Sequence, residues 1–347
     1  MNMEIWHIDG MRFHFGRHGL GQEKTGSHFT SDSLFAALVA RIVTLHGKAE
    51  AASFCERFSD NKPPFVLSSA FPRVGKILLF PPPQTSRKPM DISGAPKPKK
   101  LKQVRYVSEE LFRILLKGRK LAEEWESAEK YHDEKVLLTN SEADQLSHNI
   151  KTRKEPMWKV TRQPRVTIDR AANNSTIYHT GQVVFNRGCG LWFGLRWLNP
   201  APELEDQLPG WFAELGHAGL GGERSSGFGI CEITQKSNID FPESVNKSWV
   251  SLSRYFPKED ETSALEYHLA AYEIESVEGW IKSPHGKKDE RRKTVHMLAE
   301  GSVLGPLDAI APGQMVDAQP SYGGKTPLGH AVWRNGIALG VGLEIGG

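Results

Sequence analysis

The segment from residue 30 to residue 47 constrains the fold most, because it carries the signals of a complete amphipathic helix. Thr30 or Ser31 can cap the first turn, Asp32 suits the positive end of the helix dipole, and Gly47 can end the helix. Apolar residues recur at helical spacing: Leu34, Phe35, Leu38, Val39, Ile42 and Leu45. A helix with one apolar face requires a further layer of structure to cover that face.

Strand patterns lie on both sides of this helix. Residues 3–16 alternate, with Met11, Phe13 and Phe15 expected on one side and Arg12 and His14 on the wet side. A second helical piece runs to about residue 60, and the stretches FVLSSAF and KILLFPPP predict a hairpin. Later strand patterns, a helix at about 208–217 and the run ICEIT follow. This order predicts an α+β fold of the ferredoxin-like βαββαβ type, whose sheet face commonly binds RNA.

The chain length of 347 residues favours two such units. We expect the first over 1–237, with an insertion at 84–158, and a smaller ferredoxin-like unit over 238–347. The second unit reads as short strands with one helical stretch near 261–269. Its glycine-dense ending, GIALGVGLEI, is typical of a closing strand against which another backbone or subunit packs.

Charge is segregated along a chain whose net formal charge is only +3. Residues 87–105 hold seven Lys or Arg against one Asp, and residues 151–170 hold seven against two acids. Such clusters create a local positive field that can collect nucleic acid, although most charge runs are simply solvated loops. The lysines Lys97, Lys99, Lys100 and Lys102 are expected to supply diffuse attraction rather than a defined contact.

Other partners and cofactors find little support in the sequence. The three cysteines, Cys55, Cys189 and Cys231, are far apart and form no Cys-x-x-Cys pair, which favours a reducing compartment and argues against a zinc site. No apolar run approaches membrane length. We therefore expect a cytoplasmic protein with no metal, no cofactor and no membrane partner.

A glycine-rich stretch, GHAGLGGERSSGFG, spans residues 216–229 and contains six glycines in fourteen residues. It does not match a phosphate-binding P-loop, because Phe228 stands where the lysine is needed and the loop follows a helix. It does not match the dinucleotide fingerprint either, because Arg224 occupies the third glycine position. Two interpretations remain: a plain helix-to-strand loop, or an anion site built from Arg224, Ser225, Ser226 and free amides.

Several stretches in this order resemble the RAMP superfamily of CRISPR proteins. HFGRHGLGQEKTGSHFTSDSLFAAL is similar to the opening of the RAMP subunit that caps type III effector complexes. RVTIDRAANNSTIY resembles the segment ahead of that family's long β-hairpin, GLGGERSSGFG its glycine-rich loop, and YGGKTPLGHAVWRNGIALGVGLEI its ending. The Csm-type subunit of type III-A complexes is the closer match, and the equivalent subunit of the type III-B Cmr complex is the alternative.

The resemblance implies a role in an antiviral ribonucleoprotein. Such a subunit binds the repeat-derived 5′ handle of the crRNA and contacts the large polymerase-like signature subunit and the repeated backbone RAMP subunit. It meets target RNA only indirectly. Its long hairpin, expected here at about 166–185, is a thumb that displaces one guide base from pairing. It is not expected to be an enzyme.

The resemblance and the residue types together place RNA contacts in three regions. The glycine-rich loop supplies Gly221, Gly222, Arg224, Ser225, Ser226 and Gly227. The thumb supplies Arg165, Arg170, Asn173, Asn174, Ile177 and Tyr178, with Asp169 orienting Arg170. The end of the first strand and its loop supply His14, Arg17, His18 and Lys24. The absence of a Cβ lets phosphate approach the loop amides, and arginine adds a bidentate fork.

Two other functions remain open at this point. His14 can act as the general base of a RAMP endoribonuclease that processes precursor crRNA, as in metal-independent RNases of related fold. Asp32 is a weaker catalytic candidate, since its place at a helix start explains it. The third function is a protein-interaction scaffold whose basic segments never touch RNA.

Overall fold

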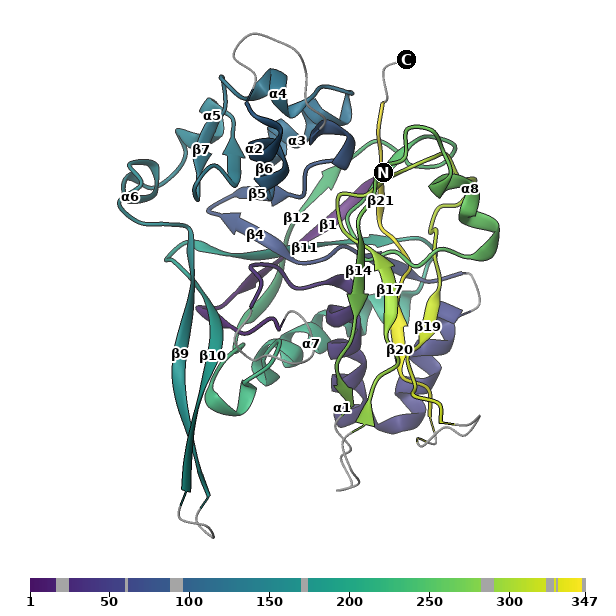
Figure 1. The fold of residues 1–347 in the computed structure, drawn as a ribbon. Coiled ribbons are helices and arrows are strands. Elements are labelled where there is room, and N and C mark those ends of the chain that lie inside the picture. Colours follow the sequence, from purple (N-terminus) through teal and green to yellow (C-terminus); the bar gives the residue numbers. More distant parts are fainter. Residues whose placement is uncertain are drawn as a thin grey trace.

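A computed structural model describes residues 1–16, 25–59, 62–87, 96–169, 174–281, 290–322, 328 and 330–344, excepting the side chains of 167–169, 174 and 176 (Figure 1). Within these ranges, none of the helices has the length and apolar character needed to cross a membrane. The molecule combines one large sheet, helices that cover it, a projecting hairpin and several small sheets. The α+β class with antiparallel sheets is confirmed.

The large sheet contains the predicted βαββαβ order. Its elements are β1 (Asn2–Asp9), α1 (Ser31–Ser59), β3 (Phe65–Leu67), β4 (Phe71–Val74), β5 (Ile77–Phe80), β11 (Cys189–Trp197), α7 (Pro202–Ala218) and β12 (Glu232–Asp240). The strands lie in the order β12-β1-β11-β4-β5, with β3 also paired to β11, and all these pairs are antiparallel. Both long helices lie on the same side of this sheet in Figure 1.

Helix α1 breaks where the sequence predicts. Gly47 has φ 89°, outside the helical region, so the two helical pieces meet at a kink. The first piece buries Leu34, Phe35, Leu38 and Ile42, whereas Leu45 is 40% exposed. The stripe expected from the sequence therefore ends one turn before the kink.

The insertion between β5 and the thumb is a compact layer at one end of the sheet (Figure 1). It contains η1 (Gln84–Arg87), α2 (Pro98–Gln103), β6 (Tyr106–Ser108), α3 (Glu109–Leu116), α4 (Leu121–Glu124), β7 (Glu129–Tyr131), β8 (Val136–Leu138), α5 (Asn140–Ala143) and α6 (His148–Lys151). Strand β6 continues the large sheet and pairs in parallel with β8. The insertion is therefore built onto the core.

The thumb is a long hairpin formed by β9 (Trp158–Asp169) and β10 (Asn174–Phe185). It begins eight residues earlier than the sequence predicts, and it projects away from the rest of the molecule (Figure 1). Its root is fixed because β10 pairs with β2 (Arg12–Phe13), joining Val183 to Phe13 and Val184 to Arg12.

The C-terminal part, after Asp240, forms small antiparallel sheets beside α1 (Figure 1). Their strands are β13 (Trp249–Ser251), β14 (Ile274–Val277), β15 (Trp280–Ile281), β16 (Glu290–Arg291), β17 (Val295–Leu298), β18 (Val303–Leu304), β19 (Met315–Asp317), β20 (Trp333–Asn335) and β21 (Gly340–Gly342). Two short helical turns, η3 (Glu259–Glu261) and α8 (Thr262–Leu265), connect β13 to β14. A Cβ on Gly342 would collide with the backbone carbonyl of Glu243, so the glycine-dense ending packs closely against another backbone, as predicted.

Candidate nucleic-acid interface

Three segments that are distant in sequence meet at the root of the thumb. They are residues 12–16, the glycine-rich loop (residues 219–229) and β10. Within this junction the amide of Gly222 donates to the carbonyl of His14 at 2.9 Å, and the amide of Gly229 donates to the carbonyl of Arg12 at 2.8 Å. The Nδ1 of His14 donates to the carbonyl of Gly181, on β10, at 2.7 Å. The glycine-rich loop and the thumb, two of the three predicted contact regions, are thus joined through residues 12–16, which belong to the third.

The glycines of this loop make room mainly for the chain itself. Gly219, Gly221 and Gly229 have φ of 85°, 84° and 81°, which L-residues with a side chain rarely adopt. A Cβ on Gly221 would collide with the carbonyl oxygen of His14, and one on Gly222 would lie 2.8 Å from the His14 ring. The expected close approach of a phosphate at Gly221 and Gly222 is therefore replaced by the close approach of residues 14 and 15.

The exposed crest of the loop lies further along the chain. Arg224, Ser225 and Ser226 form a short 3₁₀ turn, η2, that ends at Gly227 with φ 78°. All four are exposed, and a Cβ on Gly227 would meet no atom within 4 Å. This exposed part of the loop offers a charged side chain, hydroxyls and open backbone to a ligand.

An aromatic ring joins the loop to the thumb. Phe228 is 1% exposed, and the guanidinium carbons of Arg12 and Arg165 lie 5.7 and 5.4 Å from the centre of its ring. Cations favour the face of an aromatic ring, so one side chain orients both arginines. The Nε of Arg165 is buried without a hydrogen-bond partner among the described residues. The sequence identified Arg165 as a contact but not Arg12. The alternation that places Arg12 on the exposed side, next to the apolar Phe13, was the signal that could have identified it.

The described part of the thumb exposes apolar side chains. Val166 is 57% exposed and Ile177 is 67% exposed, and the two are direct cross-strand partners. Tyr178 lies opposite Arg165 and is half-buried. Large apolar side chains this exposed on a projecting hairpin are available to a partner.

Several predicted contacts cannot be placed. Arg17, His18, Lys24, Arg170 and Asn173 lie outside the described residues. The side chains of Asp169 and Asn174 also lie outside the described part, although both residues belong to the paired strands.

The expected wet face of the first strand is wrong at two positions. His14 is only 7% exposed, whereas Met11 is 72% exposed. The alternation is broken because β1 and β2 are separated at Gly10 and Met11, where a Cβ on Gly10 would lie 2.6 Å from Phe13. A buried polar ring needs a partner, and the carbonyl of Gly181 supplies it.

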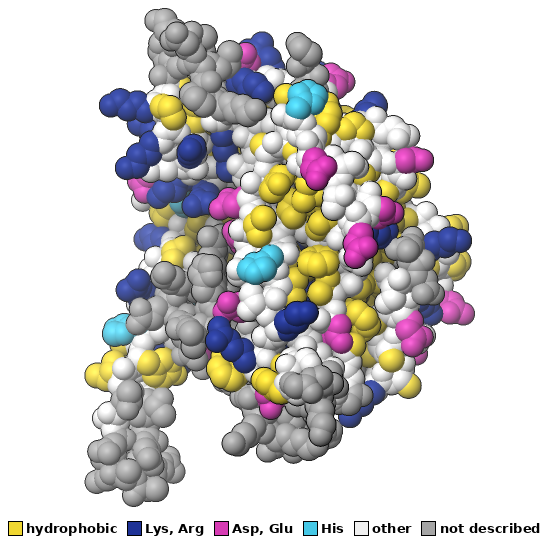
Figure 2. Space-filling view, turned by 45° about the vertical axis from the view of Figure 1, so that its right-hand side comes forward, with side chains coloured by type: hydrophobic (Ala, Val, Ile, Leu, Met, Phe, Trp, Pro, Cys, Tyr) yellow, Lys and Arg dark blue, Asp and Glu magenta, His cyan; other side chains and the backbone are white. Residues whose placement is uncertain are grey.

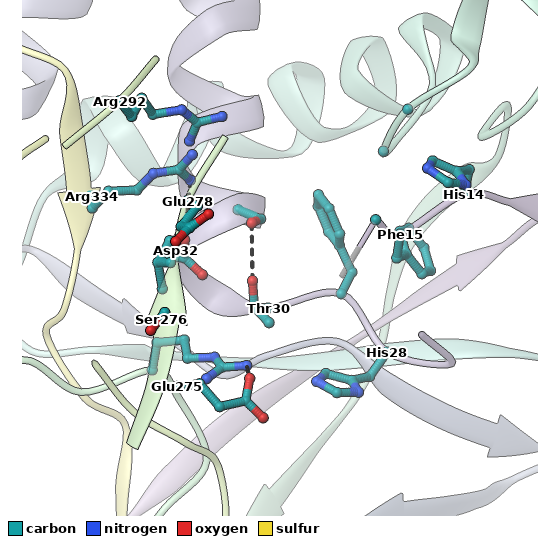
Figure 3. A pocket seen from close by; sticks show the side chains of 17 residues that line it. His14, Phe15, His28, Thr30, Asp32, Glu275, Ser276, Glu278, Arg292 and Arg334 are labelled. Atoms are coloured by element: carbon teal, nitrogen blue, oxygen red, sulfur yellow. Dashed lines mark hydrogen bonds and ion pairs between the residues drawn. The ribbon is translucent and has the colours of Figure 1, made fainter. Parts of the chain in front are cut away.

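A cleft of about 340 Å³ separates this junction from the C-terminal part (Figure 3). In Figure 3 His14 and Phe15 lie at one end, and Arg292, Arg334 and Glu278 lie at the other. Gly221 and Gly222 also line the cleft, so it shares a wall with the glycine-rich loop. The cleft mixes cations and carboxylates in its lining, which gives it no single charge preference.

Buried charges hold the two sides of this cleft together. Arg334 Nη1 lies 3.0 Å from Asp32 Oδ2, and the amide of Arg254 donates to Ser31 Oγ at 2.9 Å. Although burial lowers the pKa of Arg254, the carboxylates of Glu300 and Glu275 outweigh it and raise that pKa. The role expected for Asp32, a charge at a helix start, is thus extended: its carboxylate is the partner of a buried arginine. No cluster of three or more His, Cys, Asp or Glu suited to a metal occurs in the described ranges.

The fold and this junction combine a ferredoxin-like sheet, a thumb hairpin and a glycine-rich loop, the features in which the chain resembles RAMP-type proteins. Residues 244–343 match the family model of the CRISPR Csm4 C-terminal domain. This stretch therefore resembles the C-terminal domain of that family, and the resemblance predicted from the sequence is confirmed.

Two relatives that match over most of the chain also carry the name Csm4. The CRISPR system Cms protein Csm4 of Methanocaldococcus jannaschii is 24% identical over 327 residues, 84% of this chain and 82% of that protein. The protein of the same name from Thermococcus onnurineus is 23% identical over 317 residues, 91% of each chain.

Solved structures support the same fold. A chain from the Csm3–Csm4 subcomplex of a type III-A CRISPR-Cas interference complex matches with a TM-score of 0.65 and 17% identity, covering 99% of both chains. A chain from a Csm1–Csm4 cassette in complex with pppApA matches with a TM-score of 0.56 and 16% identity, covering 100% of this chain and 99% of the other.

Proposed function

We propose that the chain is the non-catalytic, RNA-binding Csm4 subunit of a type III-A Csm ribonucleoprotein. In this role it binds the repeat-derived 5′ handle of crRNA, caps the backbone of the complex and docks the large signature subunit. The family match, the relatives and the RAMP fold support membership of such a complex. We also propose that residues 1–237 and 238–347 act as its two domains.

The convergence of Arg12 and Arg165 on Phe228 carries the RNA-binding part of the proposal. Two like charges oriented by one ring create a positive site beside the exposed turn of Arg224. Like charges held by the same ring repel each other, and a bound anion relieves that repulsion. The ferredoxin-like fold commonly binds RNA, so the expected anion is a phosphodiester backbone. Arginine side chains and backbone amides are the usual hydrogen-bond donors to such a backbone.

The thumb supplies the second element. Val166 and Ile177 form an exposed apolar pair, which in the proposed role inserts beside a guide base. Apolar wedges that unstack a base need no hydrogen bonds of their own. His14 is buried, so we assign it to support the loop rather than to contact RNA.

The partners follow from the solved relatives. Those structures contain Csm3 and Csm1 together with Csm4. For this chain we propose the repeated backbone RAMP subunit and the large polymerase-like subunit as the corresponding partners, with target RNA met only through them.

The test is the salt dependence of binding of handle RNA to the full chain. Replacing Arg12, Arg165 and Arg224 together by Ala removes up to three phosphate contacts, so the slope of log K against log salt falls by about 2. The matched control replaces Lys48, Arg57 and Lys236, which are exposed cations elsewhere. An unchanged slope in the triple-arginine variant would show that the proposed site is wrong.

A nuclease function has one supporting observation. In the neutral ring of His14, the Nδ1 that donates to Gly181 leaves Nε2 as the acceptor nitrogen, which is the form that a general base requires. Incubation of the full chain with repeat RNA in EDTA separates the two functions. Cleavage that is lost in His14→Ala would replace the non-catalytic proposal. A complex that assembles without RNA and is insensitive to salt would instead favour the scaffold.

A further inference from the structure

The insertion carries a basic cleft that the proposed function does not use. It encloses about 460 Å³ and is lined by Pro98, Lys99, Lys102, Gln103, Arg105 and Lys135. The sequence predicted only diffuse attraction from the lysines of this segment. The fold instead gathers two of them around one cleft with Arg105 and Lys135.

Packing fixes the positions of these cations. Leu101 and Val104 are 0% exposed, which anchors α2 and leaves Lys99 and Lys102 on its exposed side. The amide of Arg105 donates to the carbonyl of Lys135 at 2.7 Å, just before the parallel strands β6 and β8 begin. Arg105 and Lys135 therefore lie side by side, where the neighbouring strands β6 and β8 begin.

The positive charge of the cleft is largely uncompensated. Its lining contains no carboxylate. Nearby Glu134 pairs with Lys100 at 2.7 Å, and Asp133 lies 3.6 Å from Lys135. With respect to the described residues, Lys99, Lys102 and Arg105 make no ion pair. Burial, and then the charge of Arg105, lower the pKa of neighbouring Arg87 to about 10.

We propose that this basic cleft binds the phosphodiester backbone of single-stranded RNA, as a contact separate from the junction at Phe228. The four cations are donors for phosphate oxygens, and the lining has no aromatic ring on which a base could stack. Binding there is therefore independent of base sequence. Figure 2 shows Lys and Arg gathered on one part of this face, above the projecting thumb.

The cleft lies where RNA leaving the thumb can reach it. Trp158, the first residue of β9, stacks on His132 with ring centres 4.0 Å apart and meets Tyr106 edge-on at 6.0 Å. Tyr106 follows Arg105 directly, so the root of the thumb packs on a residue that adjoins the cleft. The bound single strand is either the guide itself or an unpaired segment of a second RNA strand, and both present the same backbone.

The experiment measures binding of the full chain to a fluorescent oligouridine of roughly 20 nucleotides, which exceeds the usual site size of one small domain. One variant replaces Lys99, Lys102 and Arg105 by Gln. The control replaces Lys48, Arg57 and Lys62 by Gln, which removes the same charge at exposed positions of α1 and the residues after it. We expect the slope against log salt to fall by about 2 in the cleft variant, with binding roughly tenfold to a hundredfold weaker at 0.1 M salt, and little change in the control.

Three other outcomes would each overturn the proposal. Equal slopes in the parent and the cleft variant overturn it, and so does an equal loss in cleft and control variants, which would mean a diffuse field. Unchanged RNA binding with lost capture of a partner subunit would make the cleft a protein-docking surface and also overturn it.

A combined variant separates this site from the junction. Losses that add when the cleft variant is joined to Arg12→Ala, Arg165→Ala and Arg224→Ala support two sites, whereas no additional loss overturns the second site. If the junction variant binds RNA normally, the proposed function fails, but the result for the cleft variant still holds. Failure of the proposed function can therefore be distinguished from failure of the cleft proposal. Repeating the measurement with a guide RNA, alone and paired to a complementary strand, identifies the source of the bound backbone.

Discussion

Arg334 and Asp32 lie 302 residues apart in the chain and form a buried ion pair, with 3.0 Å between Nη1 and Oδ2. The side chain of Asp32 is 1% exposed and that of Arg334 is 7% exposed. The pair joins the first turn of α1 to β20 in the C-terminal part. It therefore ties α1 directly to the C-terminal part at one end of the cleft (Figure 3).

Removing one member of this pair should strongly destabilise the protein. Asp32→Ala leaves the Arg334 guanidinium buried without a counter-charge, and such losses amount to about 3–5 kcal/mol. Urea unfolding of the full chain measures the change. Removing both charges with Asp32→Ala and Arg334→Leu should recover part of it, because no unpaired charge remains.

An exposed pair provides the matched control. Glu134→Ala removes the partner of Lys100, whose side chain is 49% exposed, and should cost at most about 1 kcal/mol. A similar effect of Asp32→Ala and Glu134→Ala would contradict the structural role of the buried pair.

Two glycines of the same loop should respond differently to alanine. Gly227 and Gly221 both have positive φ, of 78° and 84°. Gly227→Ala meets open space, so its effect is the conformational penalty alone, about 1–2 kcal/mol. Gly221→Ala also collides with the His14 carbonyl and adds overpacking of about 1–3 kcal/mol. Unfolding of the two variants side by side tests this, and an equal loss would mean that residues 14 and 15 move aside.

The sequence predicted the βαββαβ core because its signals are local. The caps and periodicity around residues 31–47, the break at Gly47 and the strand ICEIT each depend on neighbouring residues only. Residues 132–158 of the insertion could not be assigned, because the helices α5 and α6 have four residues each, too few to show a period. Such short elements are held by burial against the sheet rather than by propensity.

The site was predictable in part for the same reason. Arg165 and Arg224 stood out by residue type, whereas the ring that brings Arg165 to Arg12 depends on contacts between distant segments. The glycines suggested space for a ligand, yet the space at Gly221 is filled by His14. Clustered glycines indicate that other atoms lie close to the backbone, but they do not identify whether those atoms belong to a ligand or to the protein itself.

The stability of the protein should fall between pH 7 and pH 4 through His132. Burial lowers its pKa to about 4, with Asp133 raising it and Lys135 lowering it less strongly. The folded state therefore binds this proton less readily than the unfolded state, whose pKa is 6.5. The stabilisation is complete above about pH 6.5 and is lost as the pH falls toward 4, by up to about 3 kcal/mol.

The check is unfolding by urea at several pH values in parent and His132→Gln. Gln keeps an acceptor for the Met157 amide, which donates to Nε2 of His132 at 3.2 Å, but does not titrate. His7, whose pKa is also lowered to about 4, chiefly by burial, acts in the same direction in both proteins. The difference between the two curves isolates His132, and parallel curves would contradict its burial at the root of the thumb.

The apolar pair on the thumb should affect RNA and leave stability almost unchanged. Val166 and Ile177 are 57% and 67% exposed, so replacing both by Ser should change the free energy of unfolding by no more than about 0.5 kcal/mol per site. The same change removes the surface that is proposed to displace a base. With 2-aminopurine in the guide RNA, the parent complex should show the bright fluorescence of an unstacked base, and the double variant should show a quenched signal. Val43, an exposed apolar residue on α1, gives the matched control as Val43→Ser. A double variant as bright as the parent would assign base displacement to another part of the protein.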